Sequence, residues 1–139
     1  AEDAKNFEAR AAVMANFFDS IEVAPGVHAN GEFTLGENIA DHGGLQVSYQ
    51  AFKKATAAAP LKIENGFTPE QRFFLSYANV WAGNIRPEEI LKRTKTDPHS
   101  LGKWRVDGAL PQIGAWYEAF NITEKDPMYL PVDKRLSIW

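Results

Sequence analysis

Apolar residues recur at spacings of three and four along much of this chain, and this period constrains its fold more than any other feature. No segment shows the alternation with a period of two that is typical of a half-buried strand. We therefore predict an all-α chain that forms a single domain over residues 1–139, with about five helices and an irregular tail from residue 121 onward. The first helix is expected over residues 2–18, where one face carries Phe7, Ala11, Met14, Phe17 and Phe18.

Start signals place three of the other helices. Thr34 can cap a helix that runs to about Lys54, whose apolar residues spread over more than one face and so predict burial on several sides. Thr68 is followed by Pro69 and Gln71, the pattern of a capping box with proline at the first helical position. Pro87, followed by two acidic residues that suit the positive end of the helix dipole, begins a short helix that ends before residue 97.

The remaining segments are less regular. Residues 22–33 and 57–66 are rich in proline, glycine and asparagine, which favour turns, so both are predicted to be loops. Residues 100–110 fit either a helix or an extended chain. Residues 111–120 have the apolar spacing of a last helix.

Composition excludes several classes of protein. The 15 basic and 18 acidic residues are spread along the chain, so the basic stripe of a nucleic-acid-binding protein is missing. No apolar run reaches the roughly 20 residues of a membrane-spanning helix. Without cysteine there can be no disulfide, zinc–thiolate site or cysteine nucleophile. The three histidines are too scattered for a ligand pair at helical spacing, and HExxH does not occur.

The segment TLGENIADHGG, residues 34–44, has two interpretations. In the simpler one, Thr34 and Glu37 form a capping box and Asp41 is a solvated surface charge. In the other, the two carboxylates lie one helical turn apart on the same face, so Glu37 could ligate a metal ion while Asp41 accepts a hydrogen bond from a metal-bound histidine. Small neighbours at Ala40, Gly43 and Gly44 would let another helix approach closely.

Four separated motifs resemble those of one enzyme family. They are NGEFTLGENIADHGGL, RFFLSYANVWAG, TDPHSLGKWRVDGAL and the C-terminal KRLSIW. Their order and spacing are similar to those of the neprilysin and endothelin-converting-enzyme family of zinc metalloendopeptidases, and the resemblance covers nearly the whole chain. It implies a helical subdomain of a zincin-like (gluzincin) catalytic domain, with the last residue matching the family's C-terminus.

The resemblance implies a role for six residues. Glu37 matches the third protein ligand of zinc, and Asp41 the aspartate that orients a zinc-bound histidine. His99 matches a histidine that stabilises the oxyanion, and Arg105 an arginine that binds a substrate carbonyl. Val80 and Trp81 match residues that line the pocket for the hydrophobic side chain after the cleaved bond. The substrates implied are peptides cleaved on the amino side of hydrophobic residues.

The chain departs from the family pattern because the HExxH helix, which supplies two zinc histidines and the general base, lies upstream in the family. We therefore expect a C-terminal portion of a catalytic domain whose partner is that upstream part of the same polypeptide. One carboxylate cannot retain Zn²⁺ where catalytic sites use three protein ligands, so this chain alone should bind zinc weakly and be inactive. Its unpartnered faces, around Ala40, Gly43, Gly44 and residues 73–81, should favour self-association into a homodimer.

The resemblance also implies an extracytoplasmic location, and the lack of cysteine favours a bacterial source over the disulfide-rich animal members. The alternative function is a non-catalytic helical module that binds a partner helix through its aromatic face. In that case Glu37 is only a capping residue, and its replacement by alanine should cost about 1 kcal/mol of stability without any effect on zinc.

Overall fold

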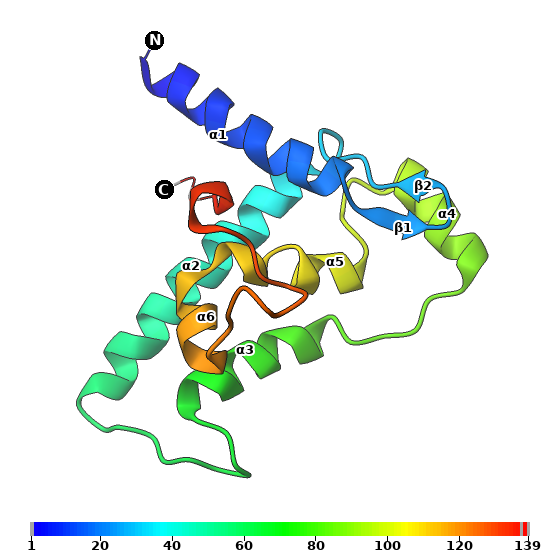
Figure 1. Ribbon diagram of the computed structural model, residues 1–139. Helices are drawn as coiled ribbons and strands as arrows, with labels where there is room; N and C mark the ends of the chain where they lie inside the picture. The colour runs from blue at the N-terminus through cyan, green and yellow to red at the C-terminus, as the bar shows by residue number, and fades with distance from the viewer. Residues whose placement is uncertain (1, 137, 139) are drawn as a thin grey trace.

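The computed structural model describes residues 2–136 and 138 and is mainly helical (Figure 1). Its elements, in chain order, are α1 (Glu2–Asp19), β1 (Glu22–Ala24), β2 (Val27–His28), α2 (Leu35–Ala57), α3 (Pro69–Val80), α4 (Pro87–Thr96), α5 (Gly102–Asp107), the 3-10 helix η1 (Leu110–Gln112), α6 (Gly114–Phe120) and the 3-10 helix η2 (Val132–Lys134). The predicted helical class is correct. No described helix combines the length and the apolar content needed to span a membrane.

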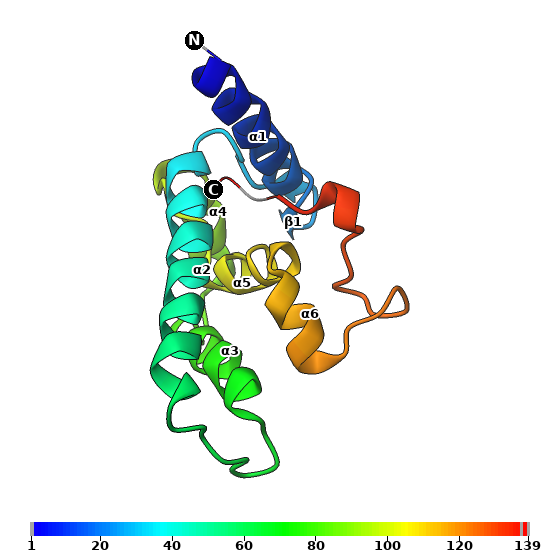
Figure 2. The ribbon, with the colours of Figure 1, turned by 90° about the vertical axis from the view of Figure 1, so that its left-hand side faces the viewer.

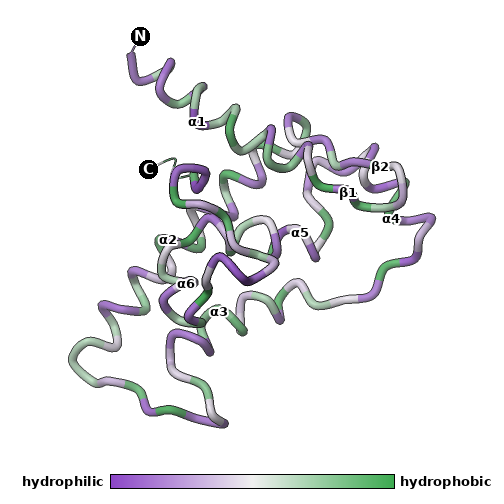
Figure 3. The backbone as a smooth tube through the Cα atoms, in the orientation of Figure 1, coloured by the Kyte–Doolittle hydropathy of each residue, from purple (hydrophilic) through white to green (hydrophobic). Residues whose placement is uncertain are grey.

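The other helices are arranged along the long helix α2. Helix α1 packs near the N-terminal end of α2, and α3 lies near the C-terminal end of α2 (Figure 2). Helices α5 and α6 lie on the same side of α2 as α3 (Figure 2). Hydrophobic and hydrophilic residues are interspersed along these helices (Figure 3). The buried residues of α2 are Asn38, His42, Gly43 and Leu45. Gly43 lies about 100° around the helix from His42, so the burial of α2 is not confined to one stripe.

Two hydrophobic clusters hold the helices together. One joins α2, α3 and α6 around the almost fully buried Phe74, with Leu45, Leu110, Ile113, Trp116 and Tyr117. The other joins α1 to the C-terminal tail through Met14, Phe18, Ile21, Leu136 and Ile138. The tail is mostly irregular, as predicted, yet it contributes to the core.

Local signals predicted helix starts with mixed success. The capping box at the start of α3 is complete: Gln71 N–H donates to Thr68 Oγ1 at 3.2 Å, and Thr68 N–H donates to Gln71 Oε1 at 3.0 Å. The ambiguous segment 100–110 contains α5, which gives six α-helices among the described residues. The last predicted helix begins later than expected, because η1 precedes α6.

The segment 22–33 was predicted to be only a loop, and this was wrong in part. It contains the antiparallel hairpin of β1 and β2, with Gly26 in the turn at φ +71°. The strands are too short to show an alternating pattern. Next to the hairpin, Gly31 passes so close to α1 that a Cβ atom there would lie 1.9 Å from the carbonyl oxygen of Ala15.

Candidate functional site

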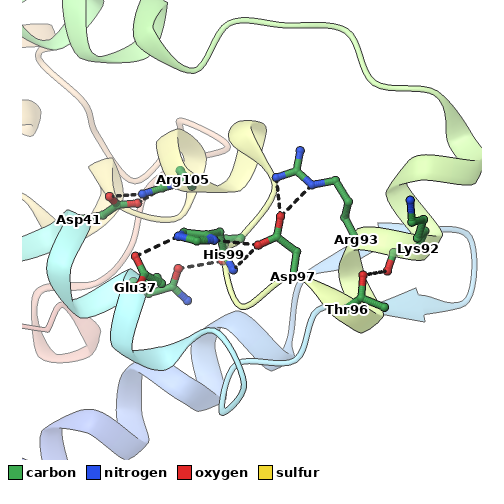
Figure 4. Close-up of polar contacts among 10 residues, drawn as sticks. Glu37, Asp41, Lys92, Arg93, Thr96, Asp97, His99 and Arg105 are labelled. Atoms are coloured by element: carbon green, nitrogen blue, oxygen red, sulfur yellow. Dashed lines mark hydrogen bonds and ion pairs between the residues drawn. The ribbon is translucent and has the colours of Figure 1, made fainter.

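The first turns of α2 present Glu37 and Asp41 on one face of the helix (Figure 4). The predicted capping box is absent, because the Thr34 hydroxyl donates to the Asn30 carbonyl at 2.9 Å and the Thr34 backbone is not extended as a capping residue requires. Glu37 does not turn back onto its own helix either. The capping interpretation of Glu37 is therefore wrong, and its carboxylate is free to face another element.

That element is the loop between α4 and α5, which carries His99. The ring Nε2 of His99 lies 3.3 Å from Glu37 Oε2, and both side chains are about two-fifths exposed, at 41% and 44%. On the other side of the ring, Nδ1 lies 2.7 Å from Asp97 Oδ1, which also accepts the backbone N–H of His99 at 3.0 Å (Figure 4). The imidazole is thus held between two carboxylates from different parts of the chain.

Asp97 is itself held by several donors. Arg93 donates to Asp97 Oδ2 from Nε at 3.0 Å and from Nη2 at 2.8 Å. The hydrogen bonds from the backbone and ring of His99, followed by those from Arg93, lower the pKa of Asp97 to about 2. The carboxylate is therefore ionised throughout the neutral pH range, and it fixes the orientation of the His99 ring.

Asp41 makes a second, more buried ion pair, so its interpretation as a solvated charge is wrong. Arg105 donates to Asp41 from Nε at 2.6 Å and from Nη2 at 2.7 Å, and each side chain is only 14% exposed. This bidentate contact raises the pKa of Arg105. The guanidinium also stacks on the Trp81 ring, 3.7 Å from its centroid.

Tyr77 supports this pair from α3. Its hydroxyl donates to the Arg105 carbonyl at 2.8 Å. Burial, and then the negative charge of Asp41, raise the pKa of Tyr77 to about 12. The tyrosine therefore stays neutral, and keeps its hydrogen bond, throughout the neutral pH range.

Val80 and Trp81 border two hollows in the surface. One, of about 520 Å³, is lined by Val80, Trp81, Arg105 and residues of the 83–85 loop, α4 and α5. The other, of about 320 Å³, lies between α2 and α3 and is lined by Ala40, Asp41, Gly44, Tyr77 and Val80 among others. The Val80 side chain is 69% exposed. Ala40 and Gly44 are exposed as expected, but Gly43 is buried.

The side-chain donors on this face determine whether a zinc ion could be held here. Glu37 offers an exposed carboxylate, a suitable oxygen donor for Zn²⁺. Within the part of the chain that the structure describes, no three His, Asp or Glu side chains gather closely enough to hold a metal ion. The donor chemistry therefore fits one position of a zinc site and leaves the other ligands to be supplied from elsewhere.

Five of the six predicted site residues thus meet around two ion-paired clusters, and the exposed Val80 lies at the edge of the hollows. The sequence analysis missed Asp97, which was treated only as the end of a helix. Its position two residues before His99 was a usable signal, because aspartate side chains often accept the N–H of the second residue after them. The contribution of Tyr77 had no such local signal, since its partner lies 28 positions away.

Comparison with known proteins identifies the family to which this chain is related. The model of peptidase family M13 matches residues 1–136. Human neprilysin is 35% identical over 99% of this chain and 19% of its own length, and bovine endothelin-converting enzyme 1 is 37% identical over 88% of this chain and 16% of its own. The chain thus spans about a fifth of the length of these curated relatives.

A solved structure gives the same result at the level of the fold. The inhibitor complex of the zinc metalloprotease Zmp1 from Mycobacterium tuberculosis superimposes with a TM-score of 0.92, with 31% identity, over 97% of this chain and 22% of Zmp1. Since the family model and the relatives cover nearly every residue that builds the two clusters, the chain belongs to peptidase family M13.

Proposed function

We propose that this chain is the part of a zinc metalloendopeptidase catalytic domain that supplies one zinc ligand and the groups that stabilise the transition state. One observation carries the proposal: Glu37, Asp41, His99 and Arg105, which come from two distant parts of the chain, lie on one face beside Trp81. The capping box on which the alternative of a binding module depends is not formed. The proposed parent acts on peptides outside the cytoplasm, as the resemblance implies.

In this proposal Glu37 holds zinc together with histidines from an upstream HExxH helix. Zinc, when bound, would supply a Lewis acid for the scissile carbonyl. Asp41 would accept a hydrogen bond from one of the ligating histidines and so set its tautomer. Arg105 limits how far Asp41 can move, because the pair is bidentate.

His99 would donate a hydrogen bond to the oxyanion that develops on the scissile carbonyl. Its imidazolium form has two N–H donors. Since Nδ1 already lies against ionised Asp97, Nε2 is the nitrogen left for the substrate. In the structure this nitrogen lies 3.3 Å from Glu37 Oε2.

Arg105 has donors left for a substrate carbonyl. Nε and Nη2 donate to Asp41, and no hydrogen bond from Nη1 is found among residues 2–136 and 138. The Trp81 ring fixes the plane of the guanidinium. With Val80, the same ring would form a wall for a hydrophobic side chain, and this supports the proposed cleavage on the amino side of hydrophobic residues.

The test uses the full-length protein that contains this chain. Glu37→Ala should lose zinc and peptide hydrolysis together, and Glu32→Ala, at an exposed glutamate just before α2, should retain both. His99→Ala should keep zinc while kcat falls by roughly a hundredfold to a thousandfold, as when an oxyanion donor is removed. Retained activity in Glu37→Ala would refute the assignment.

The isolated chain is proposed to be inactive and to bind zinc weakly, because it offers one of three protein ligands. Isothermal titration of the 139-residue chain with zinc, beside its Glu37→Ala variant, tests this point. Tight binding that depends on Glu37 would contradict it.

A further inference from the structure

A buried hydrogen bond joins the two residues that follow Glu37 and His99 in the sequence. The hydroxyl of Ser100 donates to Asn38 Oδ1 at 2.8 Å, across 62 positions of sequence. Asn38 is 3% exposed and Ser100 is 8% exposed. Each of them directly follows one member of the surface pair, Asn38 after Glu37 and Ser100 after His99. The same two chain segments are therefore joined twice, once in the interior and once at the surface.

The interior bond is part of a longer chain of hydrogen bonds. Asn38 Nδ2 donates to Thr34 Oγ1 at 3.0 Å, and the buried Thr34 hydroxyl donates in turn to the Asn30 carbonyl at 2.9 Å. The side chains of Ser100, Asn38 and Thr34 therefore each donate to an acceptor, and hydrogen bonds that are linked in this way strengthen one another in the low dielectric of the interior. The network anchors Asn38 to the turn that precedes α2.

The surface pair cannot hold the loop by itself. Glu37 and His99 are solvated, and exposed ion pairs impose little geometry. The loop between α4 and α5 has no regular secondary structure at residues 97–101. Its near end is tied by Arg93 to Asp97, and its far end is tied to α2 by the bond between Ser100 and Asn38.

We propose that Asn38 and Ser100 are positioning residues that set the place of the His99 imidazole over Glu37, and hence over the reacting carbonyl. This inference rests on the proposed peptidase function. Both side chains are buried and hydrogen-bonded to each other, and Ser100 also borders the hollow of about 520 Å³ beside Trp81. They act through His99, because an oxyanion donor is effective only when it is held close to the productive geometry.

The experiment uses the full-length protein and the single variants Ser100→Ala and His99→Ala with their double variant. Ser100→Ala should lower kcat by roughly tenfold to a hundredfold, the scale expected for a displacement of about 1 Å, with zinc content and KM within about twofold. In the His99→Ala background the same change should lower kcat by less than about twofold, because the group that it positions is already gone. Ser20→Ala is the control, since the exposed Ser20 hydroxyl also donates one hydrogen bond, in its case to the Phe17 carbonyl.

The outcomes separate the two proposals. If the wild type is active, three results for Ser100→Ala would overturn the positioning role alone: an unchanged kcat, a loss of zinc, or an equal decrease in kcat with and without His99. A wild type without zinc-dependent peptide hydrolysis overturns the proposed function, and this inference with it. Asn38→Ala should reproduce Ser100→Ala, and if it fails to fold, the Ser100 cycle decides the question.

Discussion

The ion pair between Asp41 and Arg105 should contribute measurably to the stability of this chain. Replacing Asp41 by alanine removes two short hydrogen bonds, of 2.6 and 2.7 Å, from a guanidinium that is 14% exposed. Exposed pairs contribute at most about 1 kcal/mol, and loss of one partner of a buried pair costs about 3–5 kcal/mol. Because Arg105 is partly buried and keeps its contact with Trp81, we expect a loss of about 2 kcal/mol in the free energy of unfolding.

Urea unfolding, followed by tryptophan fluorescence, measures this loss. With a slope of about 2 kcal/mol per molar urea, the midpoint for Asp41→Ala should fall by about 1 M. The matched control is Asp107→Ala, which breaks the exposed contact between Asp107 and Lys103 one turn apart on α5 and should change stability by about 0.3–0.5 kcal/mol.

Salt provides a second comparison. The Debye length falls to about 3 Å in 1 M salt, so the small effect of Asp107→Ala should vanish there while most of the effect of Asp41→Ala remains. Equal midpoint shifts for the two variants, or an Asp41→Ala effect that salt abolishes, would show that the pair behaves as an ordinary surface contact. The reasoning from its burial would then be refuted.

Three further predictions concern the core, the tyrosine beneath Arg105 and the exposed faces. Phe74→Ala should cost about 3–5 kcal/mol because Phe74 is 1% exposed, whereas Leu75→Ala, next to it and 39% exposed, should cost less than about 1 kcal/mol in the same urea assay. The pKa of Tyr77 is raised to about 12, so as the pH rises the unfolded chain loses the hydroxyl proton at a lower pH than the folded chain does. The contribution of Tyr77 to the free energy of unfolding should therefore be fully present below a pH of about 10 and should decrease as the pH rises towards 12. Tyr77→Phe should lack this component of the decrease. Light scattering should detect self-association of the isolated chain through the exposed face that includes Val80, and a strict monomer at all concentrations would contradict this expectation.

Some features of the fold could be predicted from the sequence because they depend on neighbours within one or two helical turns. The start of α3 is the clearest case, since Thr68, Pro69 and Gln71 contain all the groups that form its capping box. The apolar spacing of α1 is another, because it is that of the helix itself: Ala11, Met14 and Phe18 are buried, whereas Phe7 is exposed. The family motifs similarly identified the candidate site residues without any knowledge of their contacts.

The same local reasoning failed where another part of the chain competes for a group. Thr34 and Glu37 have the spacing of a capping box, but the Thr34 hydroxyl is used by Asn30 and Asn38, and Glu37 faces His99. The hairpin after α1 was missed because its strands are too short to display a period.

The sequence by itself therefore determined the helical class, most helix positions and the family, and it indicated the candidate site residues. Only the tertiary structure decided which of those residues meet. Asp41 and Arg105 are 64 positions apart, and Asn38 and Ser100 are 62 apart. Contacts over such distances depend on how α2 packs against the segment that carries His99 and α5, and hydrophobic burial between helices sets that packing.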